Sequence, residues 1–254
     1  MKFSEALLIV KEFFLEVLGF LIPGLIFVFI LSVTLNDKIL NEVSVKIDGS
    51  YQAPLLILIA YVLGYIIYGA SEFRDSIFSG KIYYGWCVLK WYKKHQPDKD
   101  WSLQSFEAFQ DNLYKKIKEG EAWKLSNQLL RVHLKNFDYQ INERVRDVRN
   151  LLMSYISESD NTKIYTFTFR ADLCRHLSTV FIFYVILGGV LFFSARLKPL
   201  LACNQNSCIL TFCFILVIFT IFLGKTRRRF YSIAIRVPFS MFTAYLTKAK
   251  QDEE

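Results

Sequence analysis

The sequence predicts an all-α integral membrane protein with four transmembrane helices and a helical cytoplasmic domain inserted between the second and the third. Composition is the first observation. The 254 residues are 53% hydrophobic and 21% charged, too apolar for an ordinary soluble domain and too charged for a chain wholly in lipid. The second is a set of four uncharged apolar stretches, each close to the roughly 20 residues that cross a bilayer. The third is helical spacing of apolar residues between the second and third stretches.

The four uncharged stretches form two hairpins, one in residues 1–71 and one in residues 177–224. The spans are predicted at residues 17–35, 51–71, 177–195 and 207–224. Ionisable groups inside a membrane usually serve function, so their absence from these spans argues against a proton relay or an ion-coupled transporter.

Pro23 and Gly24 interrupt the first predicted span. A proline removes one helix hydrogen bond, and in lipid the freed backbone group must find another partner. Two interpretations stay open. The pair forms a static kink, or it forms a hinge together with the nearby Gly19.

The segment before the first span is amphipathic, since Glu5, Glu12 and Glu16 share one helical face. One interpretation is an interfacial helix whose acidic face lies in water. The other is a pore entrance, in which several copies of the chain arrange Glu16 as a carboxylate ring next to the membrane. The pore or hinge candidates are therefore Glu12, Glu16, Gly19, Pro23 and Gly24.

The middle segment, residues 72–176, reads as helical. Apolar residues recur with an eleven-residue pattern from Leu130 to Leu152, which predicts one long helix over residues 121–158. Polar residues 157–162 are predicted to end it. Residues 163–178 fit either a short strand or a helical lead-in to the third span.

The distribution of Lys and Arg predicts the orientation. Residues 72–176 carry eighteen of these cations and the tail, residues 225–254, carries seven, whereas each of the other two loops carries two. Both termini and the middle domain are therefore predicted to be cytoplasmic, in the inner membrane of a bacterium. Residues 225–254 form a basic tail that is expected to rest on the membrane surface through Phe230, Phe239, Phe242 and Tyr245. The predicted anchors at anionic lipid headgroups are Arg170, Arg175, Arg227, Arg228 and Arg229.

The five cysteines lack the Cys-x-x-Cys spacing of metal or redox sites. Cys203 and Cys208 fall in the predicted outer loop, where an oxidising compartment permits a disulfide. Free thiols are the alternative.

The sequence offers no catalytic constellation, phosphate-binding loop or set of metal ligands, so we expect neither an enzyme nor a cofactor. His95, His133 and His176 are far apart in sequence, and no metal site is predicted from them. In residues 72–176 fourteen acidic residues offset the eighteen basic ones, which argues against a nucleic-acid partner.

Two functions follow from this layout. The first is a homo-oligomeric effector or channel that permeabilises the membrane when its cytoplasmic domain is triggered. The second is a non-conducting anchor, scaffold or sensor that docks a cytoplasmic protein. In architecture alone the chain resembles the small multi-span effectors of bacterial antiviral systems, which implies the first function.

Overall fold

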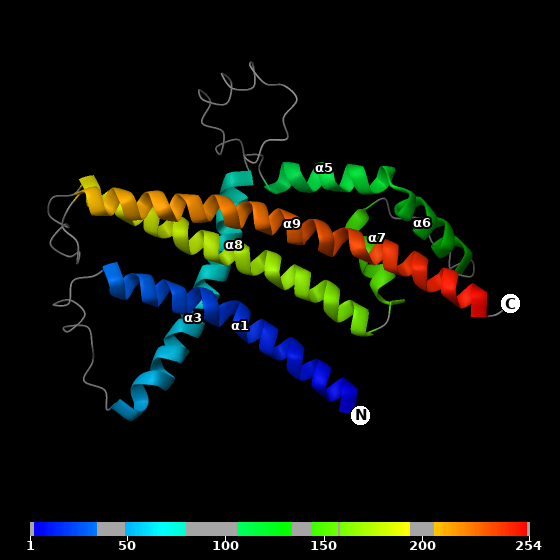
Figure 1. The fold of residues 1–254 in the computed structure, drawn as a ribbon, viewed down its shortest axis with the longest axis horizontal. Helices are drawn as coiled ribbons and strands as arrows, with labels where there is room; N and C mark the ends of the chain where they lie inside the picture. Colours follow the sequence, from blue (N-terminus) through cyan, green and yellow to red (C-terminus); the bar gives the residue numbers. More distant parts are fainter. Residues whose placement is uncertain are drawn as a thin grey trace, which may run out of the picture. The chain divides into compact units, whose positions relative to one another are not determined.

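The computed structural model describes residues 3–34, 49–79, 106–133, 144–156, 158–193 and 206–252 (Figure 1). The helices in these ranges are α1 (Phe3–Thr34), α3 (Gly49–Ser79), α5 (Phe106–Glu119), α6 (Glu121–His133), α7 (Val145–Met153), α8 (Glu158–Phe193) and α9 (Asn206–Asp252). The same ranges contain no strand, so the all-α prediction is confirmed for this part of the chain.

Four of the described helices are long and apolar enough to cross a membrane. The candidate spans are Phe13–Thr34, Tyr51–Asp75, Asn161–Val190 and Ser207–Leu246. This confirms the number and order of the predicted apolar helices. All four candidate spans extend past a predicted limit, because residues beyond the uncharged stretches continue the same helices.

The chain divides into two compact units. Unit 1 comprises Met1–Ile77 and Ala171–Arg227, and unit 2 comprises Phe78–Arg170 and Arg228–Glu254. Unit 2 therefore includes most of the predicted middle domain together with residues 228–254 of the predicted tail.

Within unit 1, α1 and α3 cross with their backbones in contact (Figure 1). A Cβ on Gly24 would overlap the Ala60 carbonyl, and a Cβ on Gly64 would overlap the Phe20 carbonyl. The two contacts lie one helical turn apart on each helix. Glycine is required at both positions because any side chain would enter the backbone of the partner helix.

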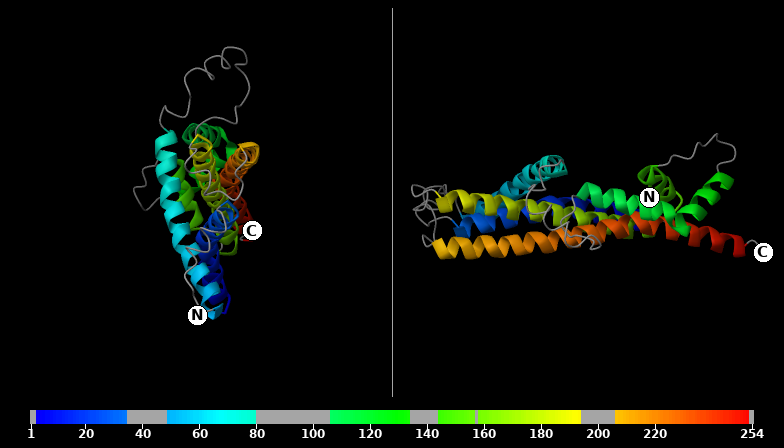
Figure 2. Two further views of the ribbon diagram at one scale, coloured as in Figure 1. Left: turned by 90° about the vertical axis from the view of Figure 1, so that its left-hand side faces the viewer. Right: turned by 90° about the horizontal axis from the view of Figure 1, so that it is seen from above.

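The core of unit 1 joins all four long helices. Residues 171–190 of α8 and 207–227 of α9 lie side by side (Figure 2). Tyr184 of α8 is buried and donates its hydroxyl to the Phe27 carbonyl of α1 at 2.7 Å. The buried members of this core are Ile30, Ile67, Val180, Tyr184 and Leu216.

Unit 2 has a core of its own, in which α5, α6 and α7 pack on the C-terminal part of α9 (Figure 1). Apolar residues one turn apart, Leu113 and Ile117, form the buried face of α5. The core also contains Leu130, Val145, Val148, Leu152, Met153, Ile156, Ile164, Ile235, Phe239 and Phe242.

The single long helix predicted over residues 121–158 is wrong. Arg144 has extended backbone dihedrals, α7 begins at Val145, and α7 ends at Met153. The periodic residues Leu130, Val148 and Leu152 are nevertheless buried in one core. Two shorter helices that fold onto the same core bury the described residues of this stripe, so for these residues the periodicity predicted burial correctly and continuity incorrectly. Leu134, Phe137 and Ile141 of the stripe lie outside the described residues.

Two further expectations change. Residues 163–178 lie in α8, so the helical alternative is correct and the strand alternative is wrong. Helix α8 begins at Glu158, which lies within the polar segment 157–162 that was predicted to break the helix. Phe239 and Phe242 are buried in the core of unit 2 rather than lying on a membrane surface. α9 continues through the predicted tail because the sequence has no helix breaker before Pro238, which the helix tolerates.

Candidate functional site

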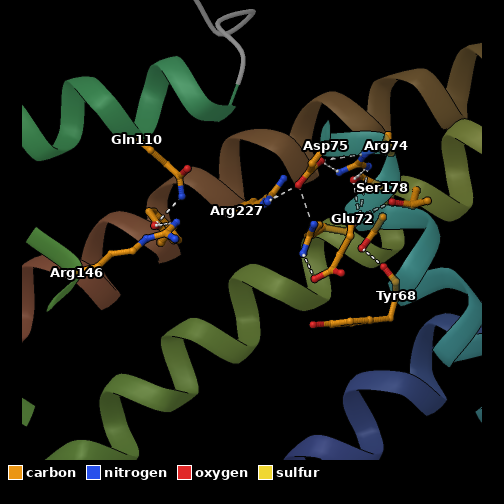
Figure 3. Close-up of polar contacts among 12 residues, drawn as sticks. Tyr68, Glu72, Arg74, Asp75, Gln110, Arg146, Ser178 and Arg227 are labelled. Carbon is orange, nitrogen blue, oxygen red and sulfur yellow. Dashed lines mark hydrogen bonds and ion pairs between the residues drawn. The ribbon is translucent and has the colours of Figure 1, made fainter. Parts of the chain in front are cut away.

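Asp75 of α3 forms the centre of an ion-pair cluster in unit 1. Its carboxylate accepts a hydrogen bond from Arg74 Nη2 at 2.8 Å and another from Arg227 Nη2 of α9 at 2.8 Å (Figure 3). Arg175 Nε of α8 lies 2.8 Å from the same carboxylate. We call Arg74, Asp75, Arg175 and Arg227 the Asp75 cluster.

Neutral and acidic partners complete the Asp75 cluster. Arg74 Nη1 donates to Ser178 Oγ at 2.7 Å, and Ser178 Oγ donates to the Arg175 carbonyl at 2.8 Å. Glu72 Oε1 lies 4.0 Å from Arg175 Nη1. Side chains from α3, α8 and α9 are therefore linked through one carboxylate.

The Asp75 cluster is largely withdrawn from solvent. The side chains of Arg74, Arg175 and Arg227 are 13%, 15% and 11% exposed, and that of Asp75 is 24% exposed. A pair so placed contributes little net stability, but removing one partner leaves the others buried and uncompensated. This geometry makes Asp75 the critical member.

The structure gives most of the predicted lipid anchors protein partners. Arg175 and Arg227 belong to the Asp75 cluster. In unit 2, Arg170 lies 5.7 Å from the centre of the Phe230 ring, and Arg228 lies 5.7 Å from that of Phe109. Arg229 is exposed. Headgroup binding by these residues stays a prediction.

The pore and hinge candidates differ in their surroundings. Pro23 and Gly24 are buried, Gly24 lies against Ala60 of α3, and Gly19 is half-buried. Glu16 is exposed and stands within the candidate span Phe13–Thr34. Glu12 lies in α1, and its side chain is outside the described part of the structure. The burial of Pro23 and Gly24 favours a static contact, while the hinge stays a prediction.

A second polar network lies in unit 2, around the Tyr231 hydroxyl. Gln110 Nε2 donates to it at 2.6 Å, and Arg146 Nη2 donates at 3.3 Å (Figure 3). The hydroxyl of Tyr114 lies 2.7 Å away and accepts a hydrogen bond from Arg146 Nε at 2.8 Å. These bonds join α5, α7 and α9.

Burial raises the pKa of Tyr114 to about 12, and the hydrogen bond with Tyr231 acts in the same direction. The hydrogen bond to Tyr231 also raises the pKa of Arg146. The network is therefore held by a neutral phenol and a charged guanidinium.

Sequence reasoning missed the Asp75 cluster, although it contained a signal. Asp75, Arg175 and Arg227 each stand just outside one predicted span, and alternating span directions place these three ends at one membrane boundary. Opposite charges at one boundary predict ion pairs. Ser178 gives no comparable signal.

The described residues contain no group of three His, Cys, Asp or Glu side chains that could hold a metal ion. Cys203 lies outside the described residues, so its disulfide with Cys208 stays a prediction. Comparisons with models of protein families, with curated proteins and with solved structures found no match.

Proposed function

We propose that this protein is a homo-oligomeric membrane effector that forms a conducting path when its unit 2, on the cytoplasmic side of a bacterial inner membrane, is triggered. In this proposal, the α1 helices of several copies line the path. Both termini lie in the cytoplasm, and anionic lipids contact the basic surface.

The observation that carries this proposal is the exposure of Glu16 within an apolar candidate span. A carboxylate is costly in lipid, so it has to face water or another polar group. A ring of Glu16 side chains around a water-filled axis meets that requirement and is a common arrangement in cation channels.

The separate core of unit 2 supports the trigger part of the proposal. Its core is built from α5, α6, α7 and the ends of α8 and α9, so it has a folded surface to offer a ligand or partner. The same observation supports the second candidate function, a non-conducting scaffold or sensor in which the spans only anchor unit 2.

The test is the membrane potential of bacteria that express the protein. Wild type is compared with Glu16→Gln and Pro23→Ala, and with Glu121→Gln as a control, because the Glu121 side chain is 89% exposed in unit 2. Membrane insertion is measured for each variant. We expect wild type and Glu121→Gln to depolarise the cells, and Glu16→Gln to alter ion selectivity or reduce depolarisation.

The scaffold function predicts other results. Inserted protein then leaves the potential intact, even after unit 2 is engaged, and substitutions on the unit 2 surface abolish function while volume-conserving changes in the spans do not. Depolarisation that is equal in all four proteins would exclude α1 as the lining of the path.

A further inference from the structure

Helix α7 of unit 2 carries two arginines whose charges are not neutralised within the described part of the chain. Arg146 and Arg149 stand three positions apart, so they share one face of α7, with about 5–6 Å between their Cβ atoms. Neither guanidinium forms an ion pair with a described carboxylate, and Asp147, which stands between them in sequence, pairs with neither. Like charges at this spacing repel each other, and an anion bound between them removes that cost.

Neutral groups of α5 and α9 orient the two guanidiniums. Arg146 donates from Nε to the Tyr114 hydroxyl at 2.8 Å and from Nη2 to the Tyr231 hydroxyl at 3.3 Å (Figure 3). Arg149 donates from Nε to the Ala234 carbonyl at 3.3 Å. Since Tyr231 and Ala234 are also three positions apart, the two contacts form successive rungs between α7 and α9. Both arginines are therefore held in place by groups that carry no charge.

Hydrogen-bond donors remain on this face after the protein contacts are made. Arg146 Nη1 and Arg149 Nη2 have no acceptor among the described residues. The Tyr114 and Tyr231 hydroxyls share one hydrogen bond of 2.7 Å, which uses only one of their two protons. The second phenolic proton has no acceptor in the described part of the chain. Unpaired donors beside two cations are the chemistry of an anion site.

The charge of this face favours a phosphate group over a carboxylate. Two guanidiniums carry two positive charges, and a phosphate monoester carries a charge of about −1.5 to −2 at pH 7. Its three oxygens accept several charge-assisted hydrogen bonds, and the planar guanidinium matches phosphate geometry. A carboxylate offers a single charge and two oxygens. Arg146 is exposed and Arg149 is half-buried, so a ligand can reach both from solvent.

We infer that Arg146 and Arg149 bind a phosphate-bearing anion on unit 2, with a phenolic hydroxyl of the Tyr231 network as a further donor. The inference deepens the proposed function by naming the class of ligand that triggers unit 2. Only this trigger role rests on the proposed function, because binding itself does not require conduction. A soluble phosphate ester and the headgroup of a phosphatidic acid lipid both present this chemistry.

Binding to the full chain tests the inference and separates the two sources. Protein in phosphatidylcholine nanodiscs is titrated with inorganic pyrophosphate by calorimetry at constant ionic strength. For the lipid source, Tm is compared between nanodiscs that contain phosphatidic acid and nanodiscs that contain phosphatidylglycerol, which is anionic but lacks a phosphate monoester. Wild type is measured beside Arg146→Gln and Arg146→Lys. Arg236→Gln is the matched control, because Arg236 is an exposed arginine of α9 in unit 2.

We expect wild type and Arg236→Gln to bind equally, and Arg146→Gln to bind at least about tenfold more weakly. Arg146→Lys keeps the charge without the planar donor pair, so its affinity should lie between them, and it replaces Arg146→Gln if that variant does not fold. A calorimetric signal assigns a soluble ligand, and a rise in Tm with phosphatidic acid alone assigns a lipid.

Two results overturn the inference. One is the absence of binding in both experiments, and the other is an equal loss in the Arg146 variants and in Arg236→Gln, which would indicate nonspecific attraction by charge. The membrane potential of cells that express Arg146→Gln then tests the trigger role separately. Binding that depends on Arg146 while the potential responds equally in wild type and variant supports the site and contradicts its role as the trigger.

Discussion

Arg149 of α7 donates a hydrogen bond from Nε to the carbonyl oxygen of Ala234 in α9, at 3.3 Å. That carbonyl is the one whose helical donor is missing, because Pro238 stands four residues later and has no N–H. Pro238 is fully buried and Arg149 is half-buried. A side chain from a neighbouring helix thus replaces the backbone donor that proline removes, and it ties α7 to α9 in unit 2.

Arg149→Met should lower the free energy of unfolding by about 1–3 kcal/mol, because it removes a charged donor from a carbonyl with no helical partner. The aliphatic part of the side chain is kept, so the loss reports the hydrogen bond. Denaturant unfolding of the full chain measures it. Arg236→Met, an exposed arginine of α9, is the control. If Arg149→Met costs as much in the Pro238→Ala background, the link between proline and arginine is refuted.

Gly24→Ala should destabilise unit 1 strongly, since the new Cβ would overlap the Ala60 carbonyl of α3. Overpacking of a core costs about 1–3 kcal/mol, and a rigid backbone atom gives way less than a side chain. Gly69→Ala is the matched control, because a Cβ there meets nothing within 4 Å. Thermal unfolding in detergent compares them. Equal Tm values for the two variants would contradict the close contact of α1 and α3.

Asp75→Asn should destabilise the protein by about 3–5 kcal/mol, because three largely buried guanidinium groups lose their shared carboxylate. The control is Glu121→Gln, which removes an ion pair whose side chains are 60% and 89% exposed and should cost under about 1 kcal/mol. Denaturant midpoints of both variants give the comparison. A similar small effect in both would show that the Asp75 cluster is solvated.

The Tyr114 network predicts loss of stability at high pH. The pKa of Tyr114 is raised to about 12 in the folded chain by burial, against about 10 when unfolded. The folded state thus holds the phenolic proton more tightly. The contribution of the Tyr114 phenol to the free energy of unfolding is fully present below about pH 10 and is lost as the pH rises from about 10 to about 12.

Tyr114→Phe tests that dependence. The variant lacks the phenol, so the fall in Tm between pH 9 and pH 12 should be shallower than in wild type on the same pH series. The difference between the two curves isolates Tyr114 from other groups that titrate in this range. Parallel curves would show that ionisation of the Tyr114 phenol does not destabilise the folded protein in this pH range.

The apolar periodicity anticipated burial better than it anticipated helix continuity. Leu130, Val148 and Leu152 are core residues as the spacing predicts, yet Arg144 separates their helices. Periodicity indicates which residues form an apolar face, but one continuous helix or two shorter helices can bury those residues in the same core. The same ambiguity applied to Phe239 and Phe242, which suit a membrane surface or a protein core equally well in sequence.

The sequence by itself determined the helical class and the four long apolar helices. The length of an apolar stretch and its lack of charged residues are local properties of the sequence. They predict a membrane-spanning helix without information on tertiary contacts. The tertiary structure decided which residues meet across the chain. It paired Gly24 with Ala60, gathered three arginines on Asp75, and brought Arg149 to the carbonyl that Pro238 leaves without a donor. Such pairs depend on helix crossing and register, and no local pattern in one sequence fixes either.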